Sequence, residues 1–460
     1  MSVLPGFIRD PSTGRFFRIA SDSSGIVGFR ASDIRAEERK KKEDEKQQQE
    51  ENTQREIQKC VDATCCDHRL ICRPHSIHEM LNSLSLGVPR STSSMRERYA
   101  EMQLDKLRDV PDQVLEVPSN MNVVGCQFLD VSADGKRITG CWAQGDYGVR
   151  MTSSAFVLHP TMNEKGVLDL GPAPNTEIIL GSSVLVDMAM APADRDVTCL
   201  LFATATSRMN RQGRVDTFCQ VATRPISARP SSFDVSSSPI YNISLRMEDQ
   251  LYSCAWSEAS TSIAIGKGNG AEIVEVVSEQ RRRLNTRDKR VISQAFDKDG
   301  SLVQGVVKND AVLNDLRSGA KPRYLPGSRN TCWIRPLKRR PYQVVLSTLD
   351  GKLRLYDTRK PCASLLSFAG HRNSHSRLPS FVDDDEDFVF AVGSDARTRI
   401  WSLSSGRLLS TLTSPSQPCP TDFPRPIYSS SWGGMTGHEA VVIAVGPHLN
   451  VYNLRLADIQ

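Results

Sequence analysis

Two short segments of the chain place an aspartate two residues before an arginine, directly after an apolar run. The first pair is Asp315 and Arg317, and the second is Asp357 and Arg359. An aspartate in this position accepts backbone N–H bonds, holds a turn and orients the arginine. The guanidinium then presents a planar, permanently charged donor fork. The pattern therefore indicates a binding surface or, as the alternative, two pairs that only brace their own hairpins.

Motifs for catalysis are absent from the sequence, which has no nucleophile elbow, no His-Glu-x-x-His motif and no Walker loop. The glycine cluster Gly266–Gly270 lies between two apolar runs that are typical of strands, so we interpret it as a hairpin turn. A phosphate-binding loop would lead into a helix instead. We expect a protein without catalytic residues and without a cofactor.

Cysteine and histidine side chains gather between residues 60 and 78, and zinc prefers such side chains as ligands. Their spacing fits none of the standard paired frameworks, so we favour chance clustering over a metal site. If a site exists, its candidate ligands are Cys65, Cys72, His75 and His78.

Charged residues form runs in the second half of the chain. We interpret the basic runs, Arg281–Arg283 with neighbours up to Arg290 and Lys338–Arg340, as solvated loops; contact with phosphates or an acidic partner is the alternative. The acidic run Asp383–Asp387 is interpreted as keeping an exposed turn soluble, with receipt of a basic substrate as the alternative. The net charge of +5 makes no case for a dedicated nucleic-acid binder, so a nucleic-acid partner is not favoured.

The composition indicates a folded globular chain, because hydrophobic residues make up 39% of 460. No run of about 18 apolar residues is present, so no membrane partner is expected. The first residues lack a basic region followed by an apolar run, so no secretory signal is expected. We therefore expect the twelve cysteines to be reduced thiols in a protein of the nucleus and cytoplasm.

The elements that position these residues repeat along the chain. Seven β-rich segments of about 48 residues follow one another, close to the 40–45-residue period of WD-repeat propeller blades. They begin near Val123, Ser183, Ser253, Val291, Arg329, Leu378 and Ile427. Asp-Gly pairs at 134–135, 299–300 and 350–351 supply tight hairpin turns. The sequence predicts an all-β fold, a seven-bladed WD-repeat β-propeller over residues 121–460.

The sixth segment is nearest to the standard repeat. His371 follows a glycine, Asp395 stands in the turn before the third strand, and Trp401 ends the repeat. In such blades these three side chains belong to a hydrogen-bonded network inside the blade. We therefore interpret them as structural rather than catalytic.

The residues before the propeller are predicted to be partly helical and partly disordered. Residues 1–20 read as an aromatic hairpin, and 21–90 as a charged linker that is disordered or a solvated helix. Residues 91–120 contain an amphipathic docking helix that begins at a capping box and carries Met95, Tyr99 and Met102 on one stripe. The helix either packs on the propeller or inserts into a groove of a partner.

These features resemble the propellers that serve as substrate receptors of cullin-4 RING ubiquitin ligases. Among them, the chain is most similar to the type-4 cullin-4-associated factors, with motifs in the same order from about residue 4 to residue 413. Besides the Asp-x-Arg doublet, the resemblance is carried by Leu4-Pro5-Gly6-Phe7 with Arg15-Phe16-Phe17-Arg18, Ser253-Cys254-Ala255-Trp256-Ser257, Gly370-His371-Arg372-Asn373, Ala391–Asp395 running on to Thr398–Leu403, and Arg407-Leu408-Leu409.

The resemblance implies a non-catalytic receptor that docks on the damage-specific DNA-binding protein adaptor of a cullin-4 ligase and presents an unknown protein substrate for ubiquitination. It assigns adaptor binding to Asp315, Arg317, Tyr356, Asp357 and Arg359, and to Met95, Tyr99 and Met102 on a helix that enters an adaptor cavity. Asn314 and Tyr356 stand where the family's box has Trp, and only the tyrosine can fill an aromatic slot. The alternative is a generic WD-repeat scaffold that assembles protein or RNA–protein complexes.

Overall fold

The computed structural model describes part of the chain, which divides into two units, Met1–Glu79 and Met80–Gln460. The described residues are 7–9, 16–18, 103–104, 107, 110–117, 123–132, 135–146, 150–162, 168–169, 176–179, 184–190, 197–209, 215–227, 244–247, 249–257, 261–284, 286, 289–318, 321–374, 377–414, 423–432 and 439–454. In the first unit, β1 (Phe7–Arg9) pairs antiparallel with β2 (Phe16–Arg18). The predicted charged linker at 21–90 lies outside the described residues.

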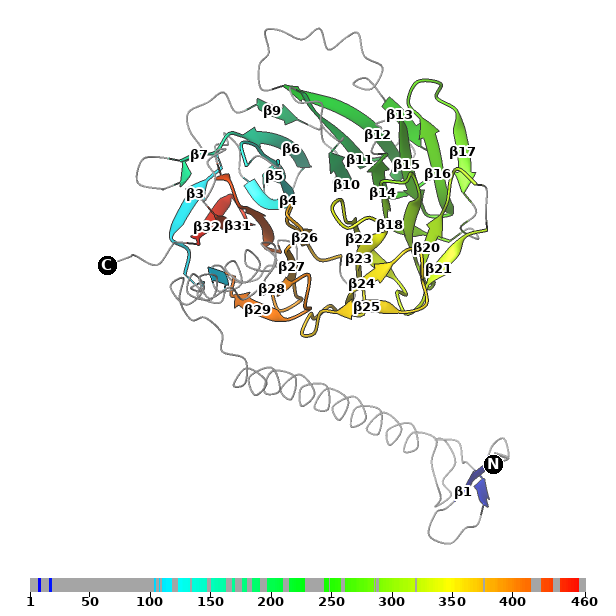
Figure 1. Cartoon of the computed structure of the whole chain (residues 1–460). Helices are drawn as coiled ribbons and strands as arrows, with labels where there is room; N and C mark the ends of the chain where they lie inside the picture. Colours follow the sequence, from blue (N-terminus) through cyan, green and yellow to red (C-terminus); the bar gives the residue numbers. More distant parts are fainter. Residues whose placement is uncertain are drawn as a thin grey trace, which may run out of the picture. The chain divides into compact units, whose positions relative to one another are not determined.

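The second unit is a seven-bladed β-propeller, as predicted from the repeat (Figure 1). Each blade is a four-stranded antiparallel sheet. Blade 1 is β4 (Val123–Val131), β5 (Ile138–Asp146), β6 (Arg150–Leu158) and β9 (Thr176–Ile179), with the short pair β7 (Thr161–Met162) and β8 (Leu168–Asp169) inserted; blade 2 is β10 (Val184–Met190), β11 (Val197–Met209), β12 (Val215–Ser227) and β13 (Ser244–Met247); blade 3 is β14 (Leu251–Trp256), β15 (Ser262–Lys267), β16 (Gly270–Glu275) and β17 (Arg281–Leu284).

The remaining blades repeat the same order. Blade 4 is β18 (Val291–Phe296), β19 (Leu302–Val306), β20 (Ala311–Asn314) and β21 (Arg323–Leu325); blade 5 is β22 (Thr331–Pro336), β23 (Gln343–Thr348), β24 (Leu353–Asp357) and β25 (Ser364–Ser367); blade 6 is β26 (Ser380–Val382), β27 (Phe388–Val392), β28 (Thr398–Ser402) and β29 (Leu408–Leu412); blade 7 is β30 (Arg425–Ser429), β31 (Ala440–Val445), β32 (His448–Asn453) and β3 (Gln113–Glu116). Among the described residues, no helix is long and apolar enough to cross a membrane.

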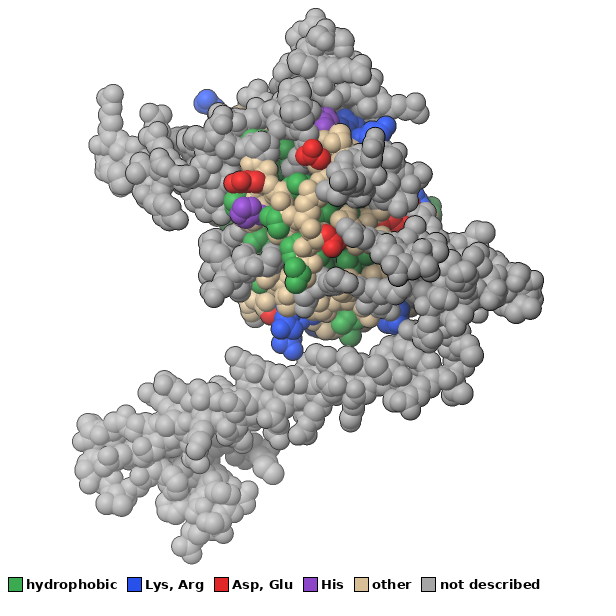
Figure 2. Space-filling view, turned by 90° about the vertical axis from the view of Figure 1, so that its left-hand side faces the viewer, with side chains coloured by type: hydrophobic (Ala, Val, Ile, Leu, Met, Phe, Trp, Pro, Cys, Tyr) green, Lys and Arg blue, Asp and Glu red, His purple; other side chains and the backbone are tan. Residues whose placement is uncertain are grey.

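Strand β3 closes the ring. It comes before blade 1 in the chain but pairs antiparallel with β32, with Gln113 opposite Val451. The propeller therefore begins upstream of residue 121, the boundary predicted from the sequence, because the last blade needs an outer strand. Figure 2 shows the side that carries β3, where hydrophobic, acidic and histidine side chains are interspersed on the described surface. Joining both ends of the repeat in one sheet leaves no open edge between first and last blade.

The residues just before β3 pack on the propeller. Leu104 is fully buried in a hydrophobic cluster with Phe388, Tyr428 and Tyr452, between blades 6 and 7, and Leu107 packs against the same cluster. Burying one leucine contributes about 1.5–3 kcal/mol. The C-terminal end of the predicted docking helix thus packs on the propeller. Met95, Tyr99 and Met102 lie outside the described residues.

Neighbouring blades are joined through a repeated pair of a serine and a glycine. The hydroxyl of Ser253 donates to the carbonyl of Val291 at 3.1 Å, and that of Ser293 donates to the carbonyl of Thr331 at 2.8 Å. Each serine faces a glycine of the second strand, Gly266 or Gly305. The glycines leave room for the carbonyl of the next blade to approach.

The strand order gives the ring two faces. The turns from the first to the second strand of every blade lie on one face, because adjacent strands are antiparallel, and so do the connections from the third to the fourth strand in blades 1 to 6. We call this face the Arg face, since Arg317 and Arg359 lie in its third-to-fourth turns. The remaining turns and the links between blades lie on the opposite face.

Candidate partner-docking site

In blade 5, Asp357 ends β24 and holds the guanidinium of Arg359. The backbone N–H of Arg359 donates to Asp357 Oδ1 at 2.8 Å, Nε donates to the same oxygen at 3.2 Å, and Nη2 donates to Oδ2 at 3.0 Å. The guanidinium also lies over the ring of Tyr342, 4.9 Å from its centroid. These side-chain hydrogen bonds from Arg359 hold the pKa of Asp357 below its usual range. The arginine is therefore fixed in direction while its side chain remains 62% exposed.

In blade 4, the corresponding pair is looser. The backbone N–H of Arg317 donates to Asp315 Oδ1 at 3.0 Å, but the Nε atom lies 3.6 Å from that oxygen. Asp299, in the first-to-second turn of the same blade, lies 3.6 Å from Nη2. The backbone N–H of Arg317 is the main cause that lowers the pKa of Asp315. The side chain of Arg317 is 65% exposed, and it shares the Arg face with Arg359.

Tyr356 is buried, which corrects its predicted role as an adaptor contact. Its ring packs among Leu325, Ile334 and Val344 between blades 4 and 5, and its hydroxyl donates to the carbonyl of Pro326 at 3.1 Å. A fully buried ring is unavailable to a partner, so Tyr356 supports the turn that carries Asp357 rather than contacting anything docked there.

Asn314, which stands at the other tryptophan position, is also buried. Its Nδ2 donates to Gln304 Oε1 at 2.7 Å, Gln304 Nε2 donates to Gln294 Oε1 at 3.4 Å, and Gln294 Nε2 donates to the carbonyl of Ser253 at 3.2 Å. This chain of amides links blade 4 to blade 3. It satisfies polar groups that would be costly to bury alone.

The basic run Lys338–Arg340 and the acidic run Asp383–Asp387 bind each other on the Arg face. The carboxylate of Glu386 accepts the backbone N–H groups of Lys338, Arg339 and Arg340, the last two at 2.9 and 3.1 Å. Arg339 also forms an ion pair of 2.6 Å with Asp385. The basic run does form a loop in which Lys338 and Arg339 are exposed, as predicted. The two runs also join blade 5 to blade 6, which was not predicted, because complementary charges meet at neighbouring turns.

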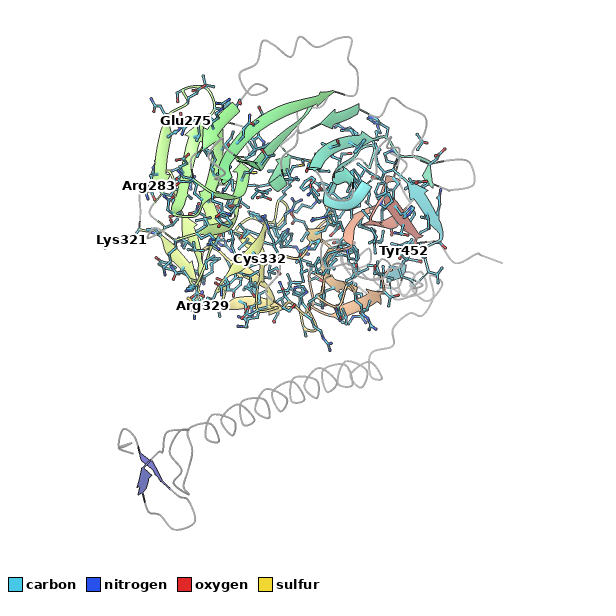
Figure 3. All side chains as sticks on the ribbon, turned by 180° about the vertical axis from the view of Figure 1, so that it is seen from behind. Glu275, Arg283, Lys321, Arg329, Cys332 and Tyr452 are labelled. Carbon is cyan, nitrogen blue, oxygen red and sulfur yellow. The ribbon has the colours of Figure 1, made fainter. Side chains whose placement is uncertain are left out.

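The run Arg281–Arg283 is also not a loop. It forms most of β17, the outer strand of blade 3, and all three side chains are exposed. Figure 3 labels Arg283 and Lys321 at the outer edge of the ring, where β17 and β21 lie. Arginines on an outer strand discourage pairing with a second chain.

His371, in the link before blade 6, and Asp395 and Trp401 of blade 6 do not form the predicted hydrogen-bonded network. Asp395 binds Arg399 through two side-chain hydrogen bonds of 3.0 and 2.6 Å, and Trp401 Nε1 donates to the carbonyl of Ala369 at 2.8 Å. The His371 ring packs edge-on against Trp401, and neither of its nitrogens has a hydrogen-bond partner among the described residues. Burial lowers the pKa of His371 to about 4, and the nearby Arg399 acts in the same direction.

Residues 208–454 match the family model of the DDB1- and CUL4-associated factor 4 beta-propeller domain. The chain belongs to this family. The matched span covers more than half of the chain and includes both Asp-x-Arg pairs, the latch between blades 5 and 6, and the His371 blade. The resemblance inferred from the sequence motifs is thereby confirmed.

Individual relatives agree with the family assignment. An uncharacterised WD repeat-containing protein of Caenorhabditis elegans is 29% identical over 98% of this chain and 90% of its own length. The human DDB1- and CUL4-associated factor 4 is 31% identical over 44% of this chain and 42% of its own length. The human DDB1- and CUL4-associated factor 4-like protein 2 is 29% identical over 52% of this chain and 62% of its own length. The matches to both human proteins thus span less than two thirds of each relative.

A contact between Arg377 and Asp187, on the side of the ring opposite the Arg face, was not predicted from the sequence. Arg377, in the link before blade 6, donates Nη2 to Asp187 Oδ1 of β10 in blade 2 at 2.9 Å and Nη1 to the carbonyl of Tyr252 in blade 3 at 3.1 Å. Asp187 Oδ2 in turn accepts the backbone N–H of Cys254 at 2.9 Å. Asp187 follows an irregularity in the register of β10, which re-aims its side chain.

The candidate zinc ligands Cys65, Cys72, His75 and His78 lie outside the described residues. Within the part of the chain that is described, no three His, Cys, Asp or Glu side chains are grouped as a metal would require. The prediction of chance clustering at 60–78 is therefore untested.

Proposed function

We propose that this protein is a substrate receptor that docks through its Arg face on DDB1 in a cullin-4 RING ubiquitin ligase. Membership of the DDB1- and CUL4-associated factor 4 propeller family supports the proposal. Two exposed arginines in neighbouring blades of one face support it further. In this role the chain recruits a protein substrate for ubiquitination, in the nucleus and cytoplasm.

The observation that carries the proposal is the fixed arginine of blade 5. Asp357 and Tyr342 hold the Arg359 guanidinium from two sides, yet the side chain stays mostly exposed. Ordering a long side chain on binding costs about 0.5–1.5 kcal/mol, and a side chain ordered beforehand avoids part of that cost. A planar fork held outward is suited to carboxylate or carbonyl acceptors on a partner.

We propose a binding role rather than a catalytic one. The inner strands β14 and β22 carry Cys254 and Cys332, and burial raises the pKa of both thiols, that of Cys332 to about 11. Thiols with such a pKa are protonated at neutral pH and are poor nucleophiles. The substrate would then bind on the opposite face or on the loops of blades 1 and 2, away from the docked adaptor.

A second candidate function is a WD-repeat scaffold without a ligase role. The contact of Arg317 with Asp299 favours it, because both residues belong to blade 4 and the pair could serve only to brace that blade. Only the receptor proposal predicts that removal of both Arg317 and Arg359 abolishes binding to DDB1.

The deciding experiment is co-purification of the full-length chain with DDB1. We expect Arg317→Ala combined with Arg359→Ala to abolish binding while the thermal unfolding midpoint stays within about 2 °C, because exposed ion pairs contribute little to stability. The matched control is Arg329→Ala combined with Arg372→Ala, which removes two exposed arginines from the opposite face. Retained binding by the first pair, or equal loss in both, would refute docking through the Arg face.

A further inference from the structure

The three consecutive arginines of β17 reach three different places. Arg281 Nη1 lies 4.0 Å from Glu272 Oε1, within its own blade. Arg283 donates Nη2 at 3.3 Å to the carbonyl of Asn269, in the second-to-third turn on the opposite face. Arg282 donates Nη1 at 3.2 Å to the carbonyl of Leu316, in the third-to-fourth turn of blade 4 on the Arg face. Alternation along a strand places Arg282 and Arg283 on opposite sides of the blade 3 sheet, and Arg282 contacts blade 4.

The contact of Arg282 places a third guanidinium beside the Asp-x-Arg pairs. Leu316 is the residue between Asp315 and Arg317, so Arg282 bridges blade 3 to the turn that holds Arg317. A guanidinium has five N–H donors, and one of them serves the Leu316 carbonyl. The Arg282 side chain is exposed, and its guanidinium reaches the third-to-fourth turn of blade 4, on the same face as Arg317 and Arg359.

We propose that Arg282 is a third anchoring arginine of the docking surface, which therefore runs across blades 3, 4 and 5. This inference depends on the proposed function, because it names a further contact for the same adaptor. Blade 3 has no Asp-x-Arg sequence after its third strand, so an arginine of the outer strand supplies the guanidinium there instead.

The charges around this strip limit its extent. Beyond Arg359, the Arg339 side chain in the basic turn of blade 5 is paired with Asp385 of blade 6, and Glu386 binds the backbone of that turn. At the other end, Glu275 and Glu279 lie at the third-to-fourth turn of blade 3, and Glu275 is labelled at the outer edge in Figure 3. Arg282, Arg317 and Arg359 thus present three exposed guanidinium groups, with Asp315 and Asp357 beside the last two, and such groups suit carboxylate or carbonyl acceptors on DDB1.

The test is the dissociation constant of purified DDB1 for the full-length chain. We expect Arg282→Ala to weaken binding about tenfold, roughly the effect of losing one charge-assisted contact. Arg283→Ala is the matched control, because it removes the adjacent arginine of the same strand, which reaches the opposite face; we expect a change of less than about twofold. Equal effects of the two substitutions would refute the proposal.

A second variant separates anchoring from support of the blade 4 turn. Arg282→Gln keeps an N–H donor for the Leu316 carbonyl but removes the charge. We expect it to bind as weakly as Arg282→Ala, and restoration of binding would overturn the anchoring role. If Arg282→Ala has no effect while the double variant of Arg317 and Arg359 loses binding, only this inference fails. If that double variant binds normally, the proposed function itself fails.

Discussion

Arg377 and Asp187 are separated by 190 residues in the chain and form an ion pair of 2.9 Å. Arg377 belongs to the link that enters blade 6, and Asp187 to the first strand of blade 2. First strands of neighbouring blades, such as β10 with β14 and β26 with β30, lie against one another around the axis, and blades 2 and 6 are on opposite sides of the ring. The pair therefore ties distant parts of the propeller together across its centre.

Removing the Arg377 contact should lower stability modestly. We expect Arg377→Ala to cost about 1 kcal/mol of unfolding free energy, because the arginine is partly exposed. Asp187→Ala should cost more, about 2–3 kcal/mol, because it also leaves the N–H of Cys254 without its acceptor. Urea unfolding measures the change in unfolding free energy for both variants and for Arg372→Ala, which serves as the control. A cost of Asp187→Ala no larger than that of the control would contradict the structural role.

The latch between blades 5 and 6 should depend on one carboxylate. Glu386 is buried and accepts three consecutive backbone N–H groups, so we expect Glu386→Ala to cost about 2–4 kcal/mol. Glu279→Ala is a matched control, because Glu279 has a similar positive φ of 53° against 59° but is exposed. The free energy of unfolding in urea checks the difference. Similar costs for both variants would show that backbone conformation, not the latch, is responsible.

Close approach of blades 4 and 5 should make Gly305 intolerant of a side chain. A Cβ at Gly305 would lie 2.0 Å from the carbonyl oxygen of Thr331, whereas one at Gly268 would have its nearest neighbour at 3.6 Å. We expect Gly305→Ala to cost about 3 kcal/mol or more, since the blades must move apart. Gly268→Ala should be nearly neutral. Thermal unfolding compares the two, and a stable Gly305→Ala variant would argue against this packing.

Stability should fall in mild acid because of His371. Its pKa in the folded protein is about 4, below the ordinary value of about 6.5, so the unfolded chain binds the proton first as the pH falls. The neutral His371 therefore contributes up to about 3 kcal/mol to the free energy of unfolding. This contribution is fully present above pH 6.5 and is lost as the pH falls towards 4. We expect His371→Phe to flatten the unfolding free energy measured between pH 7 and pH 4. An unchanged slope would mean that other groups dominate.

Local patterns in the sequence predicted most of the propeller. The glycines of the turns at 299–300 and 350–351 both have a φ of 82°, a conformation that glycine adopts without strain. The burial of Tyr356 was not predictable in this way. Alternation distinguishes a buried from a solvated face, but a blade packs between two neighbours and both its faces are buried, as the burial of Leu355 and Tyr356 shows.

The sequence alone determined the repeat, the all-β architecture, the family and the two Asp-x-Arg pairs, because each depends on residues close together in the chain. The tertiary structure decided that Glu386 binds the amides of Lys338–Arg340, that Arg377 meets Asp187, and that Arg282 reaches the turn of Arg317. The pairing of β3 with β32, which closes the ring, was likewise visible only in the tertiary structure. These contacts join segments whose separation is set only when the ring closes, and no local spacing encodes them.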